Sequence, residues 1–118
     1  MTMRQSKIDT VRFDGDSGEQ YEFRVYLWQT RFKPLPGVYV IASRTIEPGQ
    51  EPEYAPVYVG TAADMSRVLA NHPHHECFEL SLAHTIAELQ QEDEAARLRV
   101  ANDLIGKLRP PCNGETPE

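Results

Sequence analysis

The sequence predicts an α/β domain, and three observations lead to that fold class. The chain has 118 residues, which suits one domain with one hydrophobic core. Short runs rich in β-branched and aromatic residues dominate its first half. Apolar residues at helical spacing dominate its last quarter. We therefore treat residues 1–118 as a single domain that combines strands and helices.

The first predicted element is a β-hairpin. Residues 11–14 and 21–27 flank the turn-rich segment "DGDSGE". In the second of these runs, large apolar residues alternate with Glu22, Arg24 and Tyr26. We therefore expect one face of this strand to lie in the core, namely Tyr21, Phe23, Val25 and Leu27.

Two further strands are predicted after a break in regular structure. Pro34 and Pro36 cannot donate to a strand ladder, so a strand begins only after them and covers residues 37–43. Residues 44–56 contain three prolines and one glycine and read as a loop. The next strand covers residues 57–59 and ends at Gly60.

The helices are marked by caps and by periodicity. Thr61 with Asp64 fits a capping box, and the helix that follows should end at Pro73. A last helix is indicated by apolar residues at helical spacing, with a stop at Pro110: Ala95, Leu98, Ala101, Leu104, Ile105 and Leu108. Residues 76–84 fit a helix or a loop, and "TIAEL" (residues 85–89) fits a short strand.

The composition narrows the function classes. A net charge of −6 argues against broad nonspecific affinity for nucleic acid, which depends on neutralising phosphates. No apolar run approaches the roughly 20 residues of a membrane span, and the N-terminus lacks the apolar segment of a secretory signal. We therefore expect a cytoplasmic protein without membrane contact. In that compartment Cys77 and Cys112, which form no CxxC pair, should be reduced thiols.

Four segments together resemble the GIY-YIG nuclease superfamily. They are "GVY" (37–39), "YVG" (58–60), "DMSRVLANH" (64–72) and "DLIGKLRPPCN" (103–113). That superfamily includes the N-terminal domain of a nucleotide-excision-repair endonuclease, several homing endonucleases and some restriction enzymes. The resemblance covers residues 36–113 and implies a small three-stranded central sheet flanked by helices, with "TIAEL" as the third strand. Residues 1–33 would then be an N-terminal β-hairpin extension, and residues 114–118 a tail.

The resemblance also implies a set of site residues. Tyr39 and Tyr58 match the two motif tyrosines, which in the family lie beside a metal ion and help to activate water. Gly60 matches the motif glycine, His72 a position after the first helix that is often histidine, and Asn113 an asparagine that braces the site. Phosphodiester hydrolysis needs such groups because negative charge builds on the phosphate oxygens.

Three positions depart from the family pattern. Thr61 replaces a lysine that directly follows the motif glycine. The helix arginine position is Val68, and Arg67 lies one residue earlier, which on a helix is about 100° of rotation. The position of the metal-binding glutamate is Ala101, whose methyl group cannot ligate a hard cation. The sequence therefore predicts no bound metal or other cofactor.

The predicted function is that of a degenerate, non-catalytic GIY-YIG-like domain that binds nucleic acid or a protein partner. One alternative is an active endonuclease that uses Mg²⁺ or Mn²⁺, with Glu94 as a relocated carboxylate ligand. A second alternative is a structural or interaction protein without a nucleic-acid role.

Simpler interpretations of the same residues remain open. Tyrosine is common in strands, and Ala101 continues an apolar helix stripe. The cluster "HPHHEC" (72–77) contains zinc-type ligands, but Pro73 interrupts it, which favours a surface loop.

Overall fold

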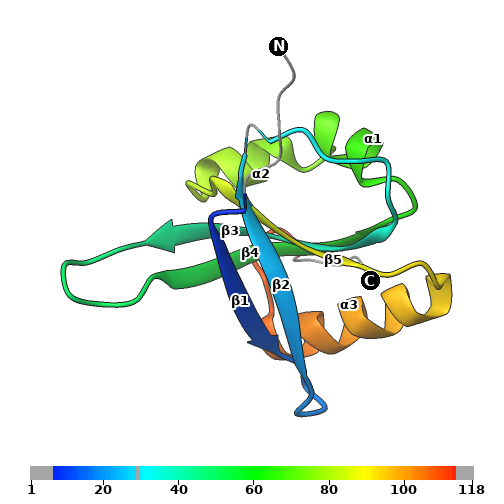
Figure 1. Ribbon diagram of the computed structural model, residues 1–118, viewed down its shortest axis with the longest axis horizontal. Coiled ribbons are helices and arrows are strands. Elements are labelled where there is room, and N and C mark those ends of the chain that lie inside the picture. Colours follow the sequence, from blue (N-terminus) through cyan, green and yellow to red (C-terminus); the bar gives the residue numbers. More distant parts are fainter. Residues whose placement is uncertain (1–6, 29, 114–118) are drawn as a thin grey trace.

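Five strands and three helices make up the regular structure of residues 7–28 and 30–113, the part of the chain that the computed structural model describes (Figure 1). The predicted tail, residues 114–118, lies outside the described residues. In chain order the elements are β1 (Asp9–Asp14), β2 (Gln20–Leu27), β3 (Gly37–Thr45), β4 (Glu53–Ala62), α1 (Met65–Ala70), α2 (His75–Leu80), β5 (Thr85–Gln90) and α3 (Glu94–Leu108).

All five strands belong to one antiparallel, curled sheet with the order β1-β2-β5-β3-β4. The predicted three-stranded central sheet with a separate hairpin extension is therefore wrong. The hairpin β1–β2 joins the sheet because β2 pairs with β5, with Val25 opposite Ala87. Without β2, one edge of β5 would expose unpaired backbone groups to water. The hairpin is thus part of the main sheet.

Each face of the sheet carries its own core. The long helix α3 packs on one face, against buried residues that include Val38, Val40 and Val59. The short helices α1 and α2 cover the other face, where Tyr39 and Ile41 lie. Because neighbouring residues of a strand point to opposite faces, β3 contributes to both cores.

Two expectations for β2 are corrected by the structure. Phe23 and Val25 are fully buried, as predicted from the alternation. Tyr26, predicted to face away, is also buried, because a second layer of structure covers its face. Leu27, predicted to lie in the core, is 47% exposed at the end of the strand.

Helices α1 and α3 begin at aspartate side-chain caps. Helix α1 begins after Asp64, whose Oδ1 accepts a hydrogen bond from the Ser66 backbone N–H at 3.0 Å. The predicted capping box is wrong because β4 runs on through Thr61 to Ala62. The undecided segment forms α2 and then a turn, in which Leu82 has φ 58°, before β5. The last predicted helix is confirmed as α3.

A disulfide joins Cys77 to Cys112, with their Cα atoms 5.9 Å apart. The expectation of two reduced thiols is therefore wrong for this structure. The cysteines are 35 residues apart in sequence, so their proximity depends on the tertiary fold. After α3 the chain runs along β4, where the Cys112 N–H donates to the Val57 carbonyl at 2.8 Å. This course brings Cys112 next to Cys77 of helix α2.

One carboxylate fastens the hairpin to α3. Asp103 accepts hydrogen bonds from the Ser17 backbone N–H at 2.8 Å and from the Ser17 hydroxyl at 2.7 Å. It also accepts one from the Tyr21 hydroxyl at 2.7 Å. A Cβ atom on Gly15 would lie 2.0 Å from Asp103 Oδ2, so a larger residue there would displace the Asp103 carboxylate.

No helix in the described part of the chain combines the length and apolar character that crossing a membrane requires.

Candidate functional site

The centre of the candidate site is a buried hydrogen bond between Tyr39 and His72. Tyr39 Oη lies 2.6 Å from His72 Nε2, and Tyr39 is only 2% exposed. The other ring nitrogen, Nδ1, accepts the His74 backbone N–H at 3.0 Å. An accepting Nδ1 leaves the proton of a neutral imidazole on Nε2. His72 therefore donates to Tyr39.

Three more rings enclose this pair: Tyr58, His74 and Phe78. The ring centroid of Tyr58 is 6.0 Å from that of Tyr39 and 5.0 Å from that of His72. Phe78 on α2 is 4.8 Å from His72, and His74 is 4.9 Å from Tyr58. We call these five residues the aromatic cluster. The cluster joins β3, β4 and α2 with the segment between the two short helices.

Burial keeps the inner members of the aromatic cluster neutral. Loss of water contact lowers the pKa of His72 to about 4, with smaller contributions from nearby His74 and His75. Burial, together with neighbouring Tyr58, raises the pKa of Tyr39 well above its usual value. At neutral pH neither side chain carries a charge. The pair therefore presents no ionised group to a phosphate or a cation.

Gly60 makes room for the ring of Tyr39. The two residues are opposite one another in the β3–β4 register. A Cβ atom at Gly60 would lie 2.5 Å from Tyr39 Oη and 2.8 Å from Tyr58 Cε2. Such distances are below van der Waals contact, so any larger side chain would displace both rings.

Asn113 braces β4 from its outer edge. Its Oδ1 accepts the Val59 backbone N–H at 2.8 Å, and its Nδ2 donates to the Val59 carbonyl at 2.9 Å. One side chain thereby satisfies both backbone groups of an edge-strand residue, next to Tyr58 in the chain.

The other residues singled out from the sequence do not join the aromatic cluster. Arg67 is exposed on α1, and Thr61 is half-buried near the end of β4. Glu94 is exposed in the first turn of α3. Ala101 belongs to the core under α3, on the opposite sheet face from Tyr39. A carboxylate at position 101 would thus be separated from the tyrosines by the sheet.

Glu88 is a carboxylate that the sequence reasoning missed. It is paired with Tyr39 on one side and with Arg24 on the other, so all three side chains share one sheet face. Burial raises the pKa of Glu88, and the charges of Arg24 and Lys33 oppose that rise. In the sequence, Glu88 is visible as the single acidic residue within "TIAEL". Its position beside Tyr39 depends on the register between β5 and β3, which the sequence does not give.

The described residues contain no group of three or more histidine, cysteine, aspartate or glutamate side chains placed to hold a metal ion. The side chains of the segment "HPHHEC" (72–77), which contains zinc-type ligands, do not converge on one point. His72 is buried against Tyr39, while His74 and His75 are exposed, and Cys77 is bonded to Cys112.

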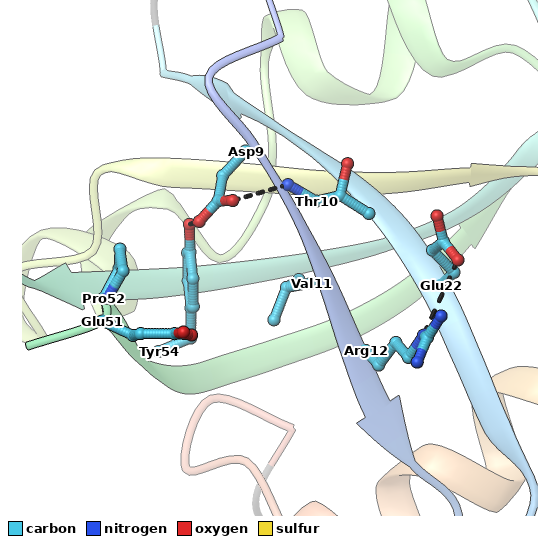
Figure 2. Close-up of a pocket in the computed structure, with 8 residues that line it drawn as sticks. All are labelled: Asp9, Thr10, Val11, Arg12, Glu22, Glu51, Pro52 and Tyr54. Carbon is cyan, nitrogen blue, oxygen red and sulfur yellow. Dashed lines mark hydrogen bonds and ion pairs between the residues drawn. The ribbon is translucent and has the colours of Figure 1, made fainter.

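Two hollows lie on different parts of the surface. A cavity of about 670 Å³ lies between the β2–β3 connection and α1, and Trp28 and Leu69 help to line it. A second hollow, of about 440 Å³, lies between β1 and the start of β4 (Figure 2). Its lining includes Asp9, Glu22 and Glu51.

Two polar groups of the second hollow, Asp9 and Tyr54, are engaged with each other. Tyr54 Oη donates to Asp9 Oδ2 at 2.7 Å and accepts from Arg44 Nε at 2.8 Å. The bond from Tyr54 lowers the pKa of Asp9, while burial raises the pKa of Tyr54 to about 12. These contacts tie the two edges of the curled sheet together, which is a structural role.

Comparison with known proteins returned no relative: no protein-family model, no curated protein and no solved structure matches this chain.

Proposed function

We propose that this chain is a non-catalytic binding domain with a GIY-YIG-like arrangement of tyrosines. The observation that carries this proposal is the state of Tyr39. Its hydroxyl is buried and accepts a hydrogen bond from His72, and its pKa is raised. A residue that activates water must instead reach the water and give up or accept a proton near neutral pH.

The surroundings of the tyrosines support the same proposal. Phosphodiester hydrolysis requires a metal ion or fixed cations at the point where charge develops. Arg67 is exposed on α1, and Ala101 is on the other side of the sheet. The aromatic cluster is then best explained as a structural centre, which holds α2 and the strands β3 and β4 in place for binding elsewhere on the surface.

A protein partner is favoured over nucleic acid by charge. The chain carries 12 basic and 18 acidic residues, a net charge of −6. Affinity for a phosphate backbone grows with the number of phosphates that lysine and arginine neutralise. A negatively charged domain starts with an unfavourable long-range contribution to that binding.

One observation favours a second candidate, an active metal-dependent endonuclease. Glu88 is the cross-strand neighbour of Tyr39, and its raised pKa is typical of a carboxylate with a functional role. In that case Glu88, and not Glu94, would be the relocated ligand for Mg²⁺ or Mn²⁺.

A cleavage assay separates the two candidates. The purified chain would be incubated with supercoiled plasmid and with labelled single-stranded DNA, in Mg²⁺ and in Mn²⁺. We expect no cleavage above a buffer control. Metal-dependent cleavage that disappears in Glu88→Gln, but persists in the matched surface variant Glu94→Gln, would contradict the binding-domain proposal and establish the endonuclease.

A further inference from the structure

The largest of the hollows described above is an apolar groove beside the only tryptophan of the chain. Its apolar lining comes from Trp28, Phe32, Leu69 and Ile86. A smaller hollow of about 140 Å³ shares Trp28, Leu69 and Ala70 with it and extends to His72. We call the two together the Trp28 groove. The groove starts at the β2–β3 connection, passes α1 and ends at the aromatic cluster.

The charge of the Trp28 groove differs from that of the whole chain. Arg31 is the lining residue with a permanent charge, and it is exposed. None of the described residues that line the groove is an aspartate or a glutamate. The segment that supplies one wall, residues 23–46, has no acidic residue and contains Arg24, Arg31, Lys33 and Arg44.

Three carboxylates lie near this local positive charge. Asp64 Oδ1 accepts a hydrogen bond from the hydroxyl of the lining residue Ser66 at 2.6 Å, and Glu79 pairs with the lining residue His75 at 3.1 Å. The third carboxylate is Glu88. It lies on the same sheet face as Ile86, two residues along β5, but it does not line the groove. The charges of Arg24 and Lys33 both lower its pKa, against the larger effect of burial, so both cations act on the Glu88 carboxylate. Asp64, Glu79 and Glu88 thus each interact with a neighbouring side chain, whereas Arg31 is an exposed cation in the groove lining.

We propose that the Trp28 groove binds a short acidic segment of a partner protein. One large apolar side chain of that segment enters the groove beside Trp28, and a neighbouring carboxylate pairs with Arg31. Aromatic and aliphatic anchors in desolvated pockets carry most of the binding energy of protein interfaces. This inference rests on the proposed binding function and adds the site and the class of partner.

The number of cations favours a peptide over a nucleic-acid strand. A polyphosphate gains affinity by engaging several lysine or arginine side chains at once, whereas Arg31 is the one permanent cation among the described lining residues. A peptide with one anchor and one or two adjacent carboxylates matches an apolar groove with one arginine at its entrance.

The single tryptophan provides a direct readout. Because Trp28 is the only tryptophan in the chain, its fluorescence reports on the groove without a label. The probes are blocked pentapeptides of sequence DEFEE, DELEE, DEAEE and KKFKK, together with the oligonucleotide octathymidylate. The variants are Arg31→Glu, which reverses the charge at the entrance, and Ala70→Phe, which fills the groove from an exposed helix position. Arg99→Glu, exposed on α3, is the matched control.

We expect saturable changes in Trp28 emission with DEFEE and DELEE. Binding of DEAEE and KKFKK should be weaker by about tenfold or more, because each lacks the anchor or the carboxylates. Arg31→Glu and Ala70→Phe should each weaken DEFEE binding by about tenfold, and Arg99→Glu should leave it unchanged. Circular dichroism of each variant establishes that it is folded.

Several results would overturn the inference. They are the absence of saturation with DEFEE and DELEE up to about 1 mM, equal binding of DEAEE, or indifference to both Arg31→Glu and Ala70→Phe. Tighter binding of octathymidylate than of DEFEE would show that the groove binds nucleic acid in preference to an acidic peptide. Each of these leaves the non-catalytic proposal standing, whereas metal-dependent DNA cleavage contradicts that proposal without any reference to the groove.

Discussion

Lowering the pH from about 8 to about 5 should destabilise this domain through His72. Burial lowers the pKa of this histidine to about 4, whereas in an unfolded chain it titrates near 6.5. The unfolded chain therefore takes up the proton first. The stability contributed by neutral His72 is complete above about pH 7 and is lost as the pH falls toward about 4.

The structure sets the size of this effect. Because His72 is 6% exposed, the pKa difference converts into a loss of about 2 kcal/mol between about pH 8 and about pH 5. For a domain of this length, such a loss lowers the melting temperature by roughly 8 °C. Asp9 and Asp103, whose pKa values are lowered, lose their contributions only at more acidic pH. Glu88, whose pKa is raised, acts in the opposite direction and makes the observed loss smaller.

The assay is a series of urea or thermal melts across this pH range, with the disulfide intact. His72→Gln should flatten the profile, and His84→Gln, at an exposed position in the turn before β5, should retain the slope of the parent. The reasoning fails if the parent profile is flat. It also fails if an NMR titration places the pKa of His72 at or above its ordinary value.

The remaining predictions concern three positions. Gly60→Ala should cost about 1–3 kcal/mol in unfolding free energy, because the added methyl group overlaps the buried ring of Tyr39 and the half-buried ring of Tyr58. Denaturant melts measure this cost, and a cost near zero contradicts the geometry. Asp103→Ala should speed amide hydrogen exchange in the hairpin turn and lower the melting temperature, whereas exposed Asn102→Ala should do neither. Asn113→Ala removes two hydrogen bonds to Val59 and should lower the free energy of unfolding by about 1–3 kcal/mol. The Val59 amide hydrogen should then exchange faster, and an unchanged exchange rate would show that the brace is dispensable.

Elements that depend on local pattern were predictable from the sequence. The alternation around Phe23 and Val25 indicated β2, and the helical spacing that includes Leu104 indicated α3. The start of α1 was misplaced because Thr61 and Asp64 satisfy a capping pattern, although the strand signal of β4 extends over Thr61. Two local signals competed there, and strand pairing with β3 decided the outcome.

Features that depend on contacts between distant segments were not predictable. The pairing of β2 with β5 made the sheet five-stranded, and nothing local to either strand specifies that partner. The Cys77–Cys112 disulfide and the pairing of Glu88 with Tyr39 depend on the same tertiary arrangement. Of the site, Tyr39, Tyr58 and His72 were singled out by motif resemblance. The burial that keeps His72 neutral and its hydrogen bond to Tyr39 required the structure.

The position of β5 in the sheet has a consequence for how the chain reaches its native state. During synthesis β1–β2 and β3–β4 leave the ribosome as two hairpins, yet the strand that joins them in the sheet comes only after both short helices. Each hairpin alone has an unpaired edge, and an isolated two-stranded hairpin is at best marginally stable in water. Folding must therefore wait for residues 85–90 and proceed through contacts between distant parts of the chain, which makes it slow for a protein of this size.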